Sequence, residues 1–108
     1  MDEPAGVARK VVFRPAANAD LARLYAYIRD QNGGPTVAIG YIRRIRAACE
    51  RLGDFPDRGT RRDDLARGLP TLGFERRATI AFRVPRDSVQ IVRVLYGGRN
   101  VDALLRQP

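Results

Sequence analysis

The sequence contains no histidine, so the side chain that most often acts as a general base near neutral pH is missing. It has a single cysteine, Cys49, which excludes an intrachain disulfide and a cysteine-based metal site. No apolar run approaches the ~18 residues that a membrane-spanning helix needs. The first ten residues, MDEPAGVARK, carry acids where a secretory signal would be positively charged. We therefore expect a cytoplasmic protein with no membrane partner, no cofactor and no metal ion.

Positive charge is in clear excess, with 20 Lys and Arg against 12 Asp and Glu and a net charge of +8. Lys10 is the single lysine in this set. Arginine makes planar, bidentate contacts with phosphate and carboxylate groups, so the surface suits nucleic acid or an acidic protein partner. The arginine codon bias of a GC-rich genome predicts the same composition, and charge alone does not decide between these interpretations.

The length of 108 residues and an apolar content of 44% predict one domain over residues 1–108, with residues 1–8 as a leader. RKVVFR (9–14) predicts an edge strand. Apolar residues at helical spacing predict a helix over 16–31 and a second over 35–52. The intervening NGGP is typical of the connection in an antiparallel helical hairpin.

The second half of the chain predicts mainly strands. Gly53 is expected to end the second helix as its C′ residue, and 54–70 is expected to be a loop with one helical turn near 63–66. Strands are predicted over 71–76, 78–84 and 88–96, with PRD (85–87) as a hairpin turn. The chain is therefore predicted to be α+β: an N-terminal strand, an antiparallel helical hairpin, then three antiparallel strands in one small sheet. We expect the sheet face away from the hairpin to be solvated or to bind a partner.

Few side chains are candidates for chemistry. The pair Asp63-Asp64 has no third ligand at metal spacing, so we interpret it as solvated loop charge. Cys49 lies on the apolar face of a predicted helix and is expected to be a core residue. Arginines gather on or beside the last strands: Arg76, Arg77, Arg83, Arg93 and Arg99. A basic sheet face can bind RNA phosphates and stabilise the charge that develops during strand cleavage, whereas a solvated antiparallel face needs polar residues in any case.

Three segments in order carry a family resemblance: VVFRPAANADLARLYAYI, GYIRRIRAACERLGDFPDRG and IVRVLYGGRNVDALL. Over about residues 9–105 the chain resembles the ParE branch of the RelE/ParE superfamily, the toxins of type II toxin–antitoxin modules. The resemblance implies a helical hairpin against a small antiparallel sheet. RelE-like members cut mRNA in the ribosomal A site with lysines, arginines and a C-terminal tyrosine. ParE-like members inhibit DNA gyrase.

Matched residue by residue, the chain retains little of the RelE-like catalytic set. Arg99 falls where those toxins carry an arginine after the last strand. Pro70 and Leu72 occupy the lysine positions, Thr79 an arginine position, and Leu105 the position of the tyrosine. A nuclease reduced to one arginine loses most of its transition-state stabilisation. The resemblance therefore favours the gyrase-directed branch.

We accordingly expect a toxin that halts growth by binding gyrase, stabilises plasmids and has no catalytic residue of its own. The expected target-binding residues are Arg83, Tyr96, Arg99 and Asn100. Tyr96 stands where the family commonly has histidine. The expected partner is an acidic, partly disordered ParD-like antitoxin that docks along the hairpin and sheet, with direct nucleic-acid binding secondary.

Two alternatives stay open. The first is a ribosome-dependent mRNA endonuclease that uses Arg76, Arg77, Arg83 and Arg99. The second is a toxin-like fold that has lost activity and serves as a binding module.

Overall fold

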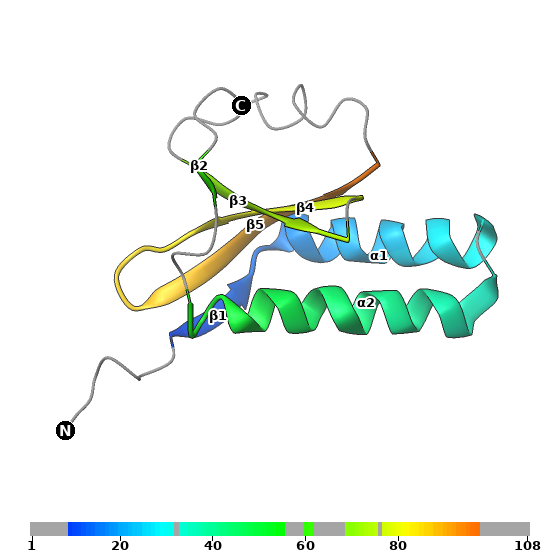
Figure 1. Cartoon of the computed structure of the whole chain (residues 1–108), viewed down its shortest axis with the longest axis horizontal. Helices are drawn as coiled ribbons and strands as arrows, with labels where there is room; N and C mark the ends of the chain where they lie inside the picture. Colours follow the sequence, from blue (N-terminus) through cyan, green and yellow to red (C-terminus); the bar gives the residue numbers. More distant parts are fainter. Residues whose placement is uncertain (1–8, 32, 56–59, 62–68, 76, 98–108) are drawn as a thin grey trace.

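In the computed structural model, which describes residues 9–31, 33–55, 60–61, 69–75 and 77–97, a helical hairpin packs against one face of a five-stranded mixed sheet. Figure 1 shows the two helices side by side and antiparallel, with the sheet as a second layer above them. The α+β architecture and the helical hairpin confirm the prediction. None of the helices in the described ranges is both long and apolar enough to cross a membrane.

The elements follow the predicted order, with one addition. They are β1 (Lys10–Phe13), α1 (Pro15–Gln31), α2 (Gly34–Arg51), β2 (Thr60–Arg61), β3 (Pro70–Phe74), β4 (Ala78–Arg83) and β5 (Ser88–Tyr96). The prediction of a continuous loop over 54–70 was wrong at β2, where two residues pair antiparallel with β3. A strand of two residues is too short to show the alternating pattern by which strands are recognised in a sequence. The helical turn expected near 63–66 lies outside the described residues.

The sheet order is β1-β5-β4-β3-β2, so β1 is the edge strand that the sequence predicted and β5 lies inside the sheet. β1 runs parallel to β5, and the other neighbours are antiparallel. A parallel pair needs a long crossover connection. Here everything between the two strands, including the helical hairpin, provides that connection.

The main core lies between the hairpin and the sheet. Its largest fully buried side chains come from α2 and its C-cap residue and from the inner strands β4 and β5: Ile45, Cys49, Leu52, Ile80, Phe82, Val89 and Ile91. A bulge in β5 changes which residues reach this core. Ala81 opposes Arg93 but Phe82 opposes Ile91, so Val92 is the extra residue. The bulge brings Val94 to the helix side and keeps Arg93 out of the main core.

The opposite face of the sheet carries a second, smaller apolar cluster, in which Leu69, Ala81 and Leu95 are buried and Val92 packs against them. We expected this face to be solvated or to bind a partner, and the part of it formed by these residues is not solvated. The period-two alternation of β4 and β5 places apolar side chains on both faces, as it does in inner strands.

Gly53 is glycine for a reason other than the expected one. The helix ends at Leu52 in right-handed conformation, and Gly53 is not among the positive-φ residues of the described chain. The backbone of the first strand instead passes directly over it. The Arg9 N–H donates to the Gly53 carbonyl at 2.8 Å, and a Cβ on Gly53 would lie 2.5 Å from the Arg9 carbonyl oxygen. Close approach of two backbones requires the glycine.

Candidate functional site

A groove of about 580 Å³ lies between α1, the end of β5 and the turn that precedes β4. β1 pairs with β5 only as far as Ile91, so no strand in the described part of the chain pairs with the last residues of β5 on that side. α1 borders this open edge and contributes Asp20, Arg23 and Tyr27 to the groove, while β5 contributes Arg93 and Tyr96. The site is thus built from segments that lie far apart in the sequence.

Asp20 is the buried polar centre of the groove, with 6% of its surface exposed. Its Oδ2 accepts hydrogen bonds from the Val94 backbone N–H at 2.9 Å and from Arg93 Nε at 2.7 Å. Its Oδ1 accepts from Arg93 Nη2 at 3.0 Å and from Arg23 Nη2 at 2.9 Å. A buried carboxylate is tolerated only when its oxygens are satisfied in this way. Asp20 therefore supplies the Val94 N–H with the acceptor that a neighbouring strand would otherwise provide. It also positions Arg23 and Arg93 through their hydrogen bonds.

Arg93 donates to Asp20 in a bidentate arrangement, which is the strong geometry for an arginine–carboxylate pair. The hydrogen bond to Asp20 raises the pKa of the Arg93 guanidinium. The carboxylate is in turn fully engaged as an acceptor. This arrangement suits the positioning of a fixed positive charge, and it leaves Asp20 poorly placed to abstract a proton from a ligand.

Aromatic rings form the wall of the groove and connect it to the core. The ring of Tyr96 lies 5.8 Å from that of Tyr27 and 5.8 Å from that of Tyr41. Tyr41 also contacts Phe74, edge to face, at 5.5 Å. Tyr27 is half exposed at the groove, whereas the Tyr41 hydroxyl is buried and has no hydrogen-bond partner among the described residues. Burial raises the pKa of Tyr41 to about 12.

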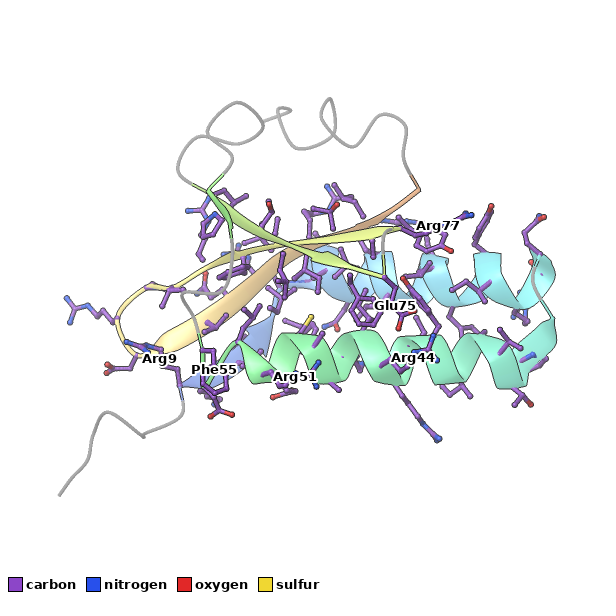
Figure 2. All side chains as sticks on the ribbon, in the orientation of Figure 1. Arg9, Arg44, Arg51, Phe55, Glu75 and Arg77 are labelled. Atoms are coloured by element: carbon purple, nitrogen blue, oxygen red, sulfur yellow. The ribbon has the colours of Figure 1, made fainter. Side chains whose placement is uncertain are left out.

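Arg77 borders the mouth of the groove. Its carbonyl accepts a hydrogen bond from the Gly97 N–H at 2.9 Å, which continues the β4–β5 ladder by one step. Gly97 has a φ of 93°, a left-handed conformation that glycine adopts without strain, so the backbone leaves the strand direction there. The Arg77 side chain is exposed and forms no ion pair within the described ranges. The nearby acid Glu75 pairs with Arg44 (Figure 2).

The structure separates the residues that the sequence grouped as target-binding candidates. Tyr96 lines the groove, but Arg83 lies at the other end of the β4–β5 hairpin, opposite Gln90. The length of β4 puts roughly 17 Å between the two ends. Arg77, a candidate of the nuclease alternative, lies with Tyr96. Arg76, Arg99 and Asn100 fall outside the described residues, as do Asp63 and Asp64.

The sequence analysis missed Asp20, Arg23 and Tyr27 as site residues, although a signal for the first was present. Asp20 lies on the buried stripe of its helix together with Ala17, Leu21, Leu24 and Ile28. An acid at an apolar position must find a cation or a donor. Arg93, the only charged residue of a largely apolar strand, was the natural partner.

The remaining reactive groups are far from the groove or inert. Lys10 lies opposite Ser88, and the stretch of β5 from there to Val94 spans roughly 20 Å. Cys49 is fully buried, as predicted, and burial raises the pKa of its thiol to about 12. Among the described residues no three His, Cys, Asp or Glu side chains come together as a metal site.

Comparison with known proteins identifies the family. Curated protein sequences show no match to the chain. Among solved structures, one described as "Chromosomal ParDE TA system from P. aeruginosa" is similar, with a TM-score of 0.74 and 25% identity. The match covers 84% of this chain and 98% of that one. The family described as "ParE toxin of type II toxin-antitoxin system, parDE" matches residues 11–101, from β1 to beyond β5. The chain belongs to the ParE toxin family of type II toxin–antitoxin systems.

Proposed function

We propose that this ParE-family toxin inhibits DNA gyrase by binding it, blocks replication, and is neutralised by a ParD-like antitoxin in the cytoplasm. Membership of the ParE family is the observation that carries the proposal. The chemistry of the groove supports binding over catalysis, because the one carboxylate among its described lining residues already accepts four hydrogen bonds from Arg23, Arg93 and Val94. The other polar side chains in that described lining are arginines and tyrosines.

The positions that would make a nuclease support the same conclusion. Pro70 and Leu72, which stand at the lysine positions of RelE-like toxins, are both in β3 and partly buried. The chain's single lysine is on the far edge strand. Cleavage of RNA needs groups that move protons and stabilise developing charge at one place. Arginines alone supply only the second of these functions.

An acidic antitoxin fits the charge of the toxin. A net charge of +8 accelerates association with an acidic partner and makes the rate sensitive to salt. The similar solved structure from P. aeruginosa is a ParDE system, which supports a partner of the ParD type for this chain as well. Apolar and basic surface along the hairpin and sheet offers both helix-in-groove and strand-addition modes.

The direct test is a supercoiling and cleavage-complex assay with purified gyrase and purified toxin. We expect loss of supercoiling and accumulation of cleaved DNA, both reversed by antitoxin. Arg83→Ala, Tyr96→Ala and Arg99→Ala should weaken the effect. Arg43→Ala is a matched control, because Arg43 is exposed on α2 and belongs to none of the candidate sets. Unchanged gyrase activity at a large excess of folded toxin would refute the proposal.

An mRNA endonuclease is the second candidate, favoured by the exposed arginines Arg77 and Arg83 beside and at the end of β4. It predicts cleaved transcripts in a translating extract, and it predicts that Arg83→Ala and Arg99→Ala abolish the cuts without unfolding the protein. Intact transcripts with the wild type would exclude it. Normal growth on expression without antitoxin would exclude both activities and leave a binding module.

A further inference from the structure

We propose that the groove between α1 and the end of β5 binds a phosphate monoester carried on a nucleoside. The same chemistry has two possible sources, a free mononucleotide and the phosphorylated end of a nucleic-acid strand. The proposal goes beyond gyrase inhibition and does not depend on it. It rests on the charge, the rings and the rigidity of the groove.

The net positive charge of the groove favours a doubly negative anion as its ligand. Among the residues that the structure describes, Arg23, Arg77 and Arg93 line it together with a single carboxylate, Asp20, which leaves an excess of two positive charges there. Arg23 and Arg93 donate to the same oxygen of Asp20, so their guanidinium groups lie beside one another. A phosphate monoester carries about −1.5 to −2 charges at pH 7 and has three acceptor oxygens.

Each arginine keeps donors for a ligand. The contact of Arg93 with Asp20 uses Nε and Nη2, and the contact of Arg23 uses one Nη2. The Arg23 side chain is 70% exposed. Arg77 is exposed without an ion pair among the residues that the structure describes, and Figure 2 shows it near the end of β5. Arginine is the side chain best suited to bidentate phosphate contacts.

The aromatic rings of the groove favour a ligand that carries a nucleobase. Tyr27 is 50% exposed, and its ring lies 5.8 Å from that of Tyr96 in the same groove. Exposed aromatic rings next to arginines are the usual platform on which bases stack. The volume of about 580 Å³ falls within the range of small-ligand sites, about 300–1,000 Å³.

Part of the site is held in place before a ligand arrives. Asp20 holds Arg93 through two bonds and is itself held by the Val94 N–H, so it acts as a positioning residue. The Gly97 N–H fixes the backbone of Arg77. Preorganised charges bind more tightly because less conformational entropy is lost on binding. An acidic peptide is the less favoured ligand, since each carboxylate carries one charge and two acceptor oxygens.

The test uses the full chain and isothermal titration calorimetry at physiological salt. The probes are AMP, adenosine, inorganic phosphate, a short oligonucleotide with and without a 5′-phosphate, and an aspartate-rich peptide. We expect AMP or the 5′-phosphorylated strand to bind, and adenosine and the unphosphorylated strand to bind at least tenfold more weakly. Binding of AMP identifies a free nucleotide as the source, and binding of the phosphorylated strand alone identifies a strand end.

Variants locate the binding. Arg77→Gln and Tyr27→Leu should each weaken it by roughly tenfold. Arg43→Gln is the matched control, because Arg43 is an exposed arginine on α2 that does not line the groove, and it should leave binding unchanged. Three results would overturn the proposal: equal binding of adenosine and AMP, no nucleotide binding up to about 10 mM, or equal losses in Arg77→Gln and Arg43→Gln. Binding of the peptide without any nucleotide would also overturn it and assign the groove to a protein partner.

Discussion

Asp20 and Arg93 are separated by 73 residues in the sequence and are joined by two hydrogen bonds of 2.7 and 3.0 Å. The pair connects α1 to β5 where β1 no longer covers the strand. Asp20 also accepts the Val94 N–H, so one carboxylate completes the sheet edge and orients the arginine of the groove. Stability and the proposed binding site therefore depend on the same contact.

Replacement of Asp20 should be costly. Asp20→Asn removes the charge and part of the acceptor capacity that satisfy Arg93 and Val94, so we expect a loss of about 2–4 kcal/mol in the free energy of unfolding. Urea denaturation followed by circular dichroism measures it. A double-mutant cycle with Arg93→Met should show a coupling of at least about 1 kcal/mol. Additive effects would contradict a direct interaction.

Gly53→Ala should destabilise the protein because the new Cβ would meet the Arg9 carbonyl oxygen at 2.5 Å. We expect a loss of about 1–3 kcal/mol as the first strand shifts away from the end of α2. Gly73→Ala is the control, since Gly73 lies in β3 and nothing is within 4 Å of its Cβ position. That variant should be neutral or more stable by about 0.5 kcal/mol. Equal effects of the two substitutions would refute this account of Gly53.

Tyr41→Phe should be nearly neutral at pH 7, or stabilising by up to about 1 kcal/mol, because the buried hydroxyl has no hydrogen-bond partner in the described part of the chain. The ring contacts with Phe74 and Tyr96 remain. Thermal denaturation of the two proteins side by side measures the difference. A substantially lower melting temperature for the variant would mean that the hydroxyl makes a stabilising contact in solution.

The same residue predicts a dependence on alkaline pH. Burial is the main cause that raises the pKa of Tyr41 from 10.0 to about 12, and electrostatic interactions with Tyr96 and Glu75 raise it further. The charges of Arg44 and Arg77 act in the opposite direction. Between these values the unfolded chain loses the proton and the folded protein keeps it, so stability falls as the pH rises. Cys49 titrates in the same direction, because burial raises the pKa of its thiol as well, and the difference between wild type and Tyr41→Phe isolates the tyrosine. A pH-independent difference from about 9 to 12 would contradict this account.

The exposed pair Arg44–Glu75 should matter much less than Asp20. The hydrogen bond from Arg44 lowers the pKa of Glu75, so the pair contributes stability above the unfolded pKa of Glu75, near 4.5, and loses it as the pH falls through the lower folded value. Both side chains are exposed, so Glu75→Gln should lower the melting temperature only slightly at pH 7. The difference should vanish in acid. A large effect at neutral pH would contradict the interpretation of this pair as a solvated contact.

Local patterns predicted most of the fold. The helical spacing of Leu21, Leu24 and Ile28 and the alternation in 78–84 depend only on neighbours in the chain, and the observed elements match them within about two residues. The glycines and prolines placed the turns correctly for the same reason. The family resemblance rested on these same segments, and the comparisons confirmed it.

What the sequence by itself determined is therefore the order and type of the elements other than β2, the amphipathic faces and the ParE family. Only the tertiary structure decided that β1 stops pairing with β5 at Ile91 and that β5 has a bulge at Val92. It also decided that Asp20 contacts Arg93 at the edge of β5 that β1 leaves uncovered. The tertiary structure also decided that residue 53 must be glycine, because the backbone at Arg9 leaves no room for a Cβ there. These features join segments far apart in the chain. Local periodicity carries no information about such contacts, because they depend on how the finished layers pack.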